Sequence, residues 1–216
     1  MPRQARSEAT RQTILLAAAE VFGRIGYAAA AMRDIVESSK LTKGAFYYHF
    51  DSKESVASAI MEQSSDILLS GFRAVQQAGA GALANTIDGA IAVAKIVAND
   101  NLARTGAHLT LTLGDSSGVA SRVHAAWVAE ITGQARLASC EGDLRRDIEP
   151  EVVAELILCT MLGALTWAGS SHGDETQRLS QTCEILLSAV TSEESLPRYQ
   201  DFLARRLPLP QPIRRE

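Results

Sequence analysis

The sequence lacks the features of several large protein classes. It has no run of 18 uncharged apolar residues, and its longest such stretch, Leu156–Gly169, has the length of a buried helix rather than of a membrane span. No basic segment followed by an apolar one stands at its start, so we expect no secretory signal. Its three cysteines, Cys140, Cys159 and Cys183, form no metal-ligand pattern, and we expect free thiols in a cytoplasmic protein.

Histidines are also few, and they are scattered. The four, His49, His108, His124 and His172, show no His-x-x-x-His spacing, and the chain carries no nucleophile motif. We therefore expect no metal, no cofactor and no enzyme activity. The alternative is a small helical enzyme that uses His108 or His124 in a pocket.

The charge is unevenly distributed along the chain. The net charge of −4 alone argues against nucleic acid as a partner. Residues 1–53, however, hold eight basic and five acidic side chains, a net charge of +3, which leaves −7 for the remainder. A basic first quarter joined to an acidic body indicates a protein that binds phosphate groups with one part only.

Aromatic residues make up 5% of the chain, yet four of them gather in the segment Leu41–Glu54. Phe46 and Phe50 are four residues apart, so on a helix they share one face, and we expect both in a core. Lys43 and Tyr47 share a different face and are predicted to point outward.

The same segment contains signals for two helix starts. The hydroxyl of Thr42 can cap one helix, and the small residues Gly44 and Ala45 let its backbone approach a flat partner closely. Ser52 can cap the next helix, which places Lys53 in a first turn where a cation gains nothing from the helix dipole. A lysine at that position suggests that it meets a phosphate.

Apolar periodicity predicts helices throughout, and therefore an all-α fold. The expected helices cover Ala9–Ile25, Ala31–Ser38, Lys43–His49, Lys53–Ala78, Leu83–Asn99, Ala103–Leu111, Val119–Cys140, Pro150–Ala168, Glu175–Val190 and Leu196–Arg206. The second and third of them form a helix-turn-helix. We expect a DNA-binding domain over residues 1–52, a connecting helix over 53–78, a ligand-binding and dimerisation domain over 53–207 and a tail over 208–216.

Five pieces of sequence stand in the order and at the spacing of one known family. They are Arg11–Leu15, Ala18–Phe22, Gly26–Tyr27, Met32–Ile35 and Thr42–Glu54. Over residues 9–60 the chain thus resembles the TetR family of bacterial transcriptional repressors. The resemblance implies a homodimer that binds a palindromic operator in double-stranded DNA. It implies DNA contacts by Arg33, Thr42, Lys43, Gly44, Ala45, Tyr47, Tyr48, His49 and Lys53.

The roles of these residues differ. Lys43 is the predicted base reader, because a lysine can donate to the O6 and N7 acceptors of guanine, and Gly44 and Ala45 would lie near the bases. The others are assigned to phosphates, which position the protein without reading sequence. Tyr48 fits a core position equally well, and His49 fits a solvated surface residue.

Two positions depart from the family pattern. Residues 28–31 are all alanine where a Thr or Ser usually caps the second helix, and a lost cap costs about 1 kcal/mol. Lys40 stands where the turn usually has glycine, so either a left-handed lysine costs about 1 kcal/mol or the turn is reshaped.

Two apolar helices of the second half suggest the dimer interface. The helix over Leu156–Trp167 is apolar nearly all round, so both of its faces must be covered. The helix over Leu179–Val190 has one apolar stripe, and two such helices from each subunit would form a four-helix interface. The alternative is that they cover only their own core.

Trp127 and Gln134 share one helical stripe and predict either the wall and polar anchor of a pocket or a packed Trp beside a partly exposed Gln. Arg104–Gly106, Leu109, Trp127 and Asp147–Glu149 are similar to the γ-butyrolactone receptor branch of the family. That resemblance implies that Trp127 lines a pocket for a small, largely apolar lactone. Polar groups expected with it are Thr110, His124 and Gln134.

The resemblance predicts a repressor that its ligand releases from the operator. The ligand would swing the helix over 53–78 and change the separation of the two reading helices, so that ligand and DNA weaken each other's binding. The alternative is a DNA-binding regulator with a different ligand or with none.

Overall fold

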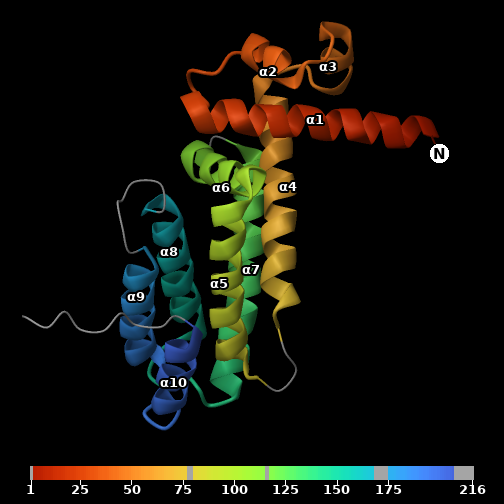
Figure 1. Cartoon of the computed structure of the whole chain (residues 1–216). Coiled ribbons are helices and arrows are strands. Elements are labelled where there is room, and N and C mark those ends of the chain that lie inside the picture. The colour runs from red at the N-terminus through yellow and green to blue at the C-terminus, as the bar shows by residue number, and fades with distance from the viewer. Residues whose placement is uncertain (1, 77–79, 115–116, 168–174, 207–216) are drawn as a thin grey trace, which may run out of the picture. The chain divides into compact units, whose positions relative to one another are not determined.

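The computed structural model describes residues 2–76, 80–114, 117–167 and 175–206, with side chains for 4–76, 80–114, 117–164 and 181–206 (Figure 1). These residues form helices joined by turns, with no strand and one isolated β-bridge between Leu144 and Thr191, so the all-α prediction is confirmed. None of the described helices is long and apolar enough to cross a bilayer. The helices are α1 (Pro2–Ile25), α2 (Met32–Ser39), α3 (Lys43–His49), α4 (Lys53–Ala74), α5 (Ala82–Asn99), α6 (Asn101–Leu113), α7 (Gly118–Cys140), α8 (Pro150–Trp167), α9 (Glu175–Val190) and α10 (Leu196–Arg206).

Most helix boundaries lie within one residue of the predicted ones, and the larger differences are at α1, α4 and α6. Helix α1 begins seven residues earlier than Ala9, and α4 ends at Ala74 instead of Ala78. Helix α6 begins two residues earlier than predicted, because Asp100 caps it by accepting a hydrogen bond from the Ala103 amide at 2.9 Å. The predicted tail over 208–216 and the side chains of Trp167 and Leu179 lie outside the described part of the chain.

The chain divides into two compact units. One contains Met1–Ser70 and Lys95–Ala125, and the other contains Gly71–Ala94 and Ala126–Glu216. Helices α4, α5 and α7 each contribute residues to both units. The units are defined by contacts, so the predicted functional boundary at residues 52 and 53 stays a prediction.

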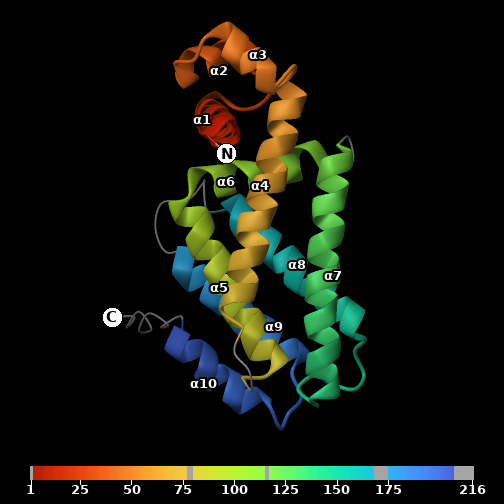
Figure 2. The ribbon, with the colours of Figure 1, turned by 90° about the vertical axis from the view of Figure 1, so that its right-hand side faces the viewer.

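The first unit is built around α1. This helix contacts α2, α3 and α6, and it lies between α2 and α6 in both views (Figure 1, Figure 2). Ile14, Ile35 and Phe46 are fully buried in the shared core, and Phe50 is 5% exposed. The predicted core positions of Phe46 and Phe50 are confirmed.

Helix α6 fits closely against its neighbours in this unit. Ser64 Oγ on α4 donates to the Ala103 carbonyl at 2.7 Å, and Thr105 Oγ1 donates to the Ala19 carbonyl on α1 at 3.2 Å. A methyl group on Gly106 would lie 2.8 Å from the Ile60 carbonyl oxygen, so only glycine permits this approach. A shift of α6 therefore displaces α1 and α4.

The structure shows how the chain accommodates the two positions that depart from the resembled pattern, the missing cap before α2 and Lys40 in the turn after it. Ala31 has no capping side chain, but its amide donates to Asp34 Oδ2 at 2.8 Å, which supplies one half of a capping box. Lys40 has a φ of +57° and is therefore in the left-handed conformation, the first of the two predicted alternatives. A lysine thus occupies a left-handed position in this turn.

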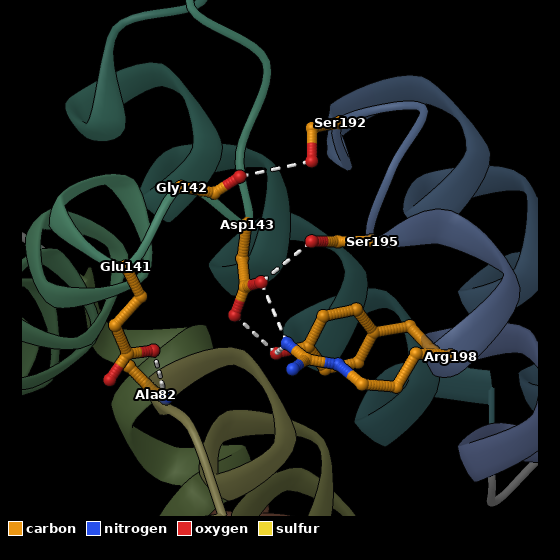
Figure 3. A network of polar contacts seen from close by, with 8 residues as sticks. Ala82, Glu141, Gly142, Asp143, Ser192, Ser195 and Arg198 are labelled. Atoms are coloured by element: carbon orange, nitrogen blue, oxygen red, sulfur yellow. Dashed lines mark hydrogen bonds and ion pairs between the residues drawn. The ribbon is translucent and has the colours of Figure 1, made fainter.

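A buried carboxylate, that of Asp143, joins several segments of the second unit (Figure 3). Asp143 is 3% exposed and accepts hydrogen bonds from Ser195 Oγ at 2.8 Å, from Arg198 at 2.7 Å and from the Tyr199 hydroxyl. Burial, and next the hydrogen bond to Asp143, raise the pKa of Tyr199, so the phenol stays protonated and keeps donating. Glu141 accepts from the Ala82 amide at 2.7 Å. These bonds hold α10 and the start of α5 at the loop after α7.

We expect Asp143→Ala to lower the free energy of unfolding by about 1–3 kcal/mol, because it leaves the buried hydroxyl of Tyr199 without an acceptor. Asp147→Ala is the matched control, since this aspartate lies in the same loop and pairs with Arg145 at 2.6 Å but is exposed. Its loss should lower the free energy of unfolding much less, because an exposed ion pair is screened by solvent. Urea unfolding followed by circular dichroism measures both, and equal effects would contradict the role assigned to Asp143.

Candidate nucleic-acid interface

Helix α3 presents an open face. Thr42 Oγ1 accepts from the Ala45 amide at 3.2 Å and caps the helix, as predicted. Lys43 and Gly44 in its first turn are exposed, and Ala45 is half-buried. A methyl group built on Gly44 would meet no atom within 4 Å, so nothing of the described chain blocks an approach to the backbone there.

The aromatic residues of α3 divide between core and surface. Tyr47 is 53% exposed and touches the edge of buried Phe46, with ring centroids 5.7 Å apart. Tyr48 is 77% exposed, which excludes the core alternative, and His49 is half-buried with its ring 5.1 Å from that of Tyr48. One short helix thus exposes a cation, two phenols and an imidazole.

Further polar groups flank α3. The side chain of Arg33 on α2 is 83% exposed and lies 3.5 Å from Asp34, a weak surface pair. Lys40 is exposed in the turn between α2 and α3. The Thr42 hydroxyl accepts the capping bond and still has its proton to donate to a phosphate oxygen.

Lys53 has a role that the sequence did not indicate. Its ammonium donates to the carbonyls of Tyr27 at 2.9 Å and Ala30 at 3.0 Å, and it lies 4.4 Å from the centre of the Tyr27 ring. The Tyr27 hydroxyl donates in turn to Glu54 at 3.3 Å. Lys53 therefore ties the loop between α1 and α2 to the start of α4, and one of its three N–H groups remains for a phosphate.

The predicted ligand-binding residues are divided between the units. Thr110 and His124 belong to the first: the Thr110 hydroxyl donates to the Gly106 carbonyl at 2.9 Å, and His124 is exposed. Trp127 and Gln134 belong to the second, where both are half-buried. Gln134 lines a polar hollow with Glu141 and Asp143, whereas Trp127 packs elsewhere.

Trp127 packs edge-on against the buried ring of Phe72, with centroids 5.8 Å apart and planes at 82°. Phe72 lies directly on the backbone of α5, because a methyl group on Gly89 would come within 2.5 Å of its ring carbons. Trp127 therefore contacts α5 through one intervening side chain.

The second unit also contains a small apolar cavity of about 70 Å³ that is open on one side. The hydroxyls of Thr86 and Thr160 in its wall donate to carbonyls four residues earlier at 2.8 Å, so the wall offers no free donor there. Burial raises the pKa of the Cys183 thiol to about 11, and the thiol stays uncharged at neutral pH. The described lining consists of Leu83, Thr86, Ile87, Ala90, Ile91, Val93 and Ala94 from α5, Ile157, Thr160, Met161 and Ala164 from α8, and Cys183, Leu186 and Leu187 from α9.

Helices α8 and α9 expose large apolar side chains. Val152 is 54% exposed, Leu156 41% and Ile185 71%, while Leu187 and Val190 are buried. Covering such side chains contributes about 1.5–3 kcal/mol each. The described part of the apolar stripe on α9 therefore packs into the core of its own chain, and Ile185 remains exposed.

The arrangement has known counterparts. Residues 14–60 match the family of bacterial regulatory proteins called tetR. The chain is 32% identical over 192 residues to the A-factor receptor protein of Streptomyces griseus, which covers 88% of this chain and 67% of that protein. It is 39% identical over 70 residues to the transcriptional regulator UidR of Escherichia coli, covering 32% of this chain and 36% of that one.

Solved structures agree over nearly the whole chain. A γ-butyrolactone receptor, described as ArpA-like, has a TM-score of 0.75 at 26% identity, covering 93% of this chain and 97% of that one. CprB of Streptomyces coelicolor in complex with its operator has a TM-score of 0.78 at 28% identity, covering 94% and 98%. These relatives are receptors and transcriptional regulators, and none is an enzyme.

Proposed function

Because the chain belongs to the TetR family of bacterial regulatory proteins, we propose that it acts as a homodimeric repressor that a small, largely apolar ligand releases from its operator. The relatives leave no support for the enzyme alternative, since they are a receptor protein, a transcriptional regulator and an operator-bound TetR family protein. We propose a DNA-binding part over residues 1–52 and a ligand-binding and dimerisation part over 53–207, joined by α4.

The observation that carries the DNA-binding function is the exposed face of α3. Its Lys43 and Gly44 are open to an approaching duplex, while its Phe46 anchors the helix in the core. We assign base reading to Lys43, with Gly44 and Ala45 next to the bases. We assign phosphate contacts to Arg33, Thr42, Tyr47, Tyr48, His49 and Lys53, which lie on or beside α3 or next to the loop before α2.

Lys43→Ala should weaken operator binding by about 1–3 kcal/mol and relax the preference for one base pair, because it removes a donor pair to guanine. Lys95→Ala is the matched control, since Lys95 is exposed on α5 and outside the proposed interface. Titrations with the operator and with single-base variants measure both effects. Equal affinity and preference in Lys43→Ala and the parent would contradict the assignment.

One copy of α3 reads a half-site, and two copies must fit one duplex about 34–36 Å apart along the DNA. The exposed apolar side chains of α8 and α9, with Ile185 foremost, support a second copy of this chain as their cover. We propose a four-helix interface from Leu156–Trp167 and Leu179–Val190 of both subunits. Isologous pairing would bury the same side chains twice.

Ile185→Glu should raise the dissociation constant of the dimer at least about tenfold, because it places a charge where an apolar side chain is covered. Leu137→Glu is the control, since Leu137 is 54% exposed on α7 and outside the proposed interface. Sedimentation velocity over a range of concentrations distinguishes the variants. A parent protein that is monomeric at every concentration with operator present would exclude the dimer.

For the ligand we propose a γ-butyrolactone-type signal, the class that the solved relative is named for. The apolar cavity of the second unit supports this, because its mostly aliphatic wall suits the alkyl part of such a ligand. The branch resemblance implies that Trp127 lines the ligand pocket, and Thr110, His124 and Gln134 stay predicted polar groups of that pocket. The contact of Trp127 through Phe72 to α5 would make its fluorescence sensitive to the cavity.

Ala90→Leu, which fills part of the cavity, should leave operator affinity unchanged and abolish release by lactones. Trp127→Ala should do the same if the ring takes part in binding, and Ala129→Leu, at an exposed position of α7, is the control. Operator release across a lactone series of increasing chain length measures the effect. Normal release from Ala90→Leu would exclude the cavity, and no release of the parent would favour the regulator with another ligand or with none.

The proposed switch uses elements of both functions. Ligand binding would shift α5, and α6 follows it after a single residue, Asp100. Because α6 fits closely against α1 and α4, a shift of α6 would be passed on to the helix-turn-helix formed by α2 and α3. Ligand and DNA would then weaken each other's binding, by a coupling of typically about 1–3 kcal/mol.

A further inference from the structure

From Gln4, where the described side chains begin, to Thr10, α1 has no large apolar side chain to bury. From Ile14 onward the inward stripe is apolar and buried, but its continuation toward the N-terminus carries Arg11, Ser7 and Gln4. A few helical turns gain too little by themselves to form in water, so this stretch depends on the rest of α1 for its shape. It is an extension of α1 with a polar inner face.

This extension starts beside the reading helix. The guanidinium of Arg11 lies 5.5 Å from the centre of the Phe50 ring, and Phe50 is the residue that ends α3. Figure 1 shows the N-terminal part of α1 running on past α3. Residues 4–10 add seven residues, or about 10 Å of helix, beyond that point. The major groove is about 12 Å wide, so the extension is long enough to reach the phosphates that border a groove occupied by α3.

The charges of the extension favour a polyanion. Glu8 lies 3.9 Å from Arg11, so these two charges largely balance each other. Arg6 is exposed and makes no ion pair with any described residue. The remainder of the chain beyond residue 53 is acidic, which leaves this basic quarter as the part suited to phosphate.

We propose that the extended start of α1, through Arg6, binds phosphates of the operator that flank the base pairs read by α3. The proposal rests on the proposed function, and it adds a contact outside the helix-turn-helix. Because a phosphate contact carries no sequence information, Arg6 contributes affinity and salt dependence but no base preference. The operator footprint should therefore be longer than the palindrome itself.

The test compares two duplexes carrying the palindrome that the parent protein selects from a random pool, one trimmed to the palindrome and one with flanking base pairs. The parent should bind the longer duplex more tightly. Arg6→Ala should bind both equally, and for the longer one the slope of log K against log salt should fall by about 0.9 per subunit. Arg6→Lys should restore most of the difference, since lysine keeps the charge.

Arg24→Ala is the matched control, because Arg24 is exposed on the same helix, 18 residues or about 27 Å away. It should behave like the parent. Three results would overturn the inference and leave the repressor function intact. The parent could bind both duplexes equally, Arg6→Ala could keep the parent's preference for the longer duplex, or Arg24→Ala could lose that preference as much as Arg6→Ala does. Failure to select any duplex would overturn the repressor function itself.

Discussion

The burial of Phe46 is the constraint on which the account depends. Helix α3 has seven residues, so it has room for one anchored face and one free face. With Phe46 fully buried, and with Thr42 fixing where the helix starts, the side chains of Lys43 and Tyr47 must point away from the core. The exposed chemistry of the helix therefore follows from its packing. Any sequence that keeps this aromatic anchor can vary the outer face and change the operator that it reads.

The helix-turn-helix was largely predictable because the sequence patterns that determine it are local. Residues four apart share a helix face, which placed Phe46 and Phe50 in the core, and a Ser or Thr before a helix caps it. The role of Lys53 was not predictable, since its partners are the carbonyls of Tyr27 and Ala30, which only the tertiary fold brings near. The early start of α1 was missed because its first turns lack the apolar stripe from which a helix is read.

The second unit shows the limits of periodicity more clearly. The apolar pattern of the sequence predicted α8 and α9. Such a pattern indicates which side chains are covered, but it does not indicate whether a cavity remains between the packed helices. The cavity arises from the way α5 lies against these two helices. Likewise, a glycine inside a helix normally weakens the helix. At Gly89, however, the missing side chain lets the Phe72 ring reach the backbone of α5, and Trp127 packs against that ring. A ligand that displaces α5 would thus be sensed by a tryptophan outside the cavity.

The central claim is that the outer face of α3 enters the DNA groove. Site-specific photocrosslinking tests it most directly, with a benzophenone side chain in place of Tyr47 and, in a second protein, in place of Ile25. Both positions are exposed, at 53% and 38%, but only Tyr47 lies on the reading helix. The account predicts efficient crosslinks to operator duplex from position 47 and none above background from position 25. Equal crosslinking from the two positions, or none from position 47 in a protein that still binds the duplex, would contradict it.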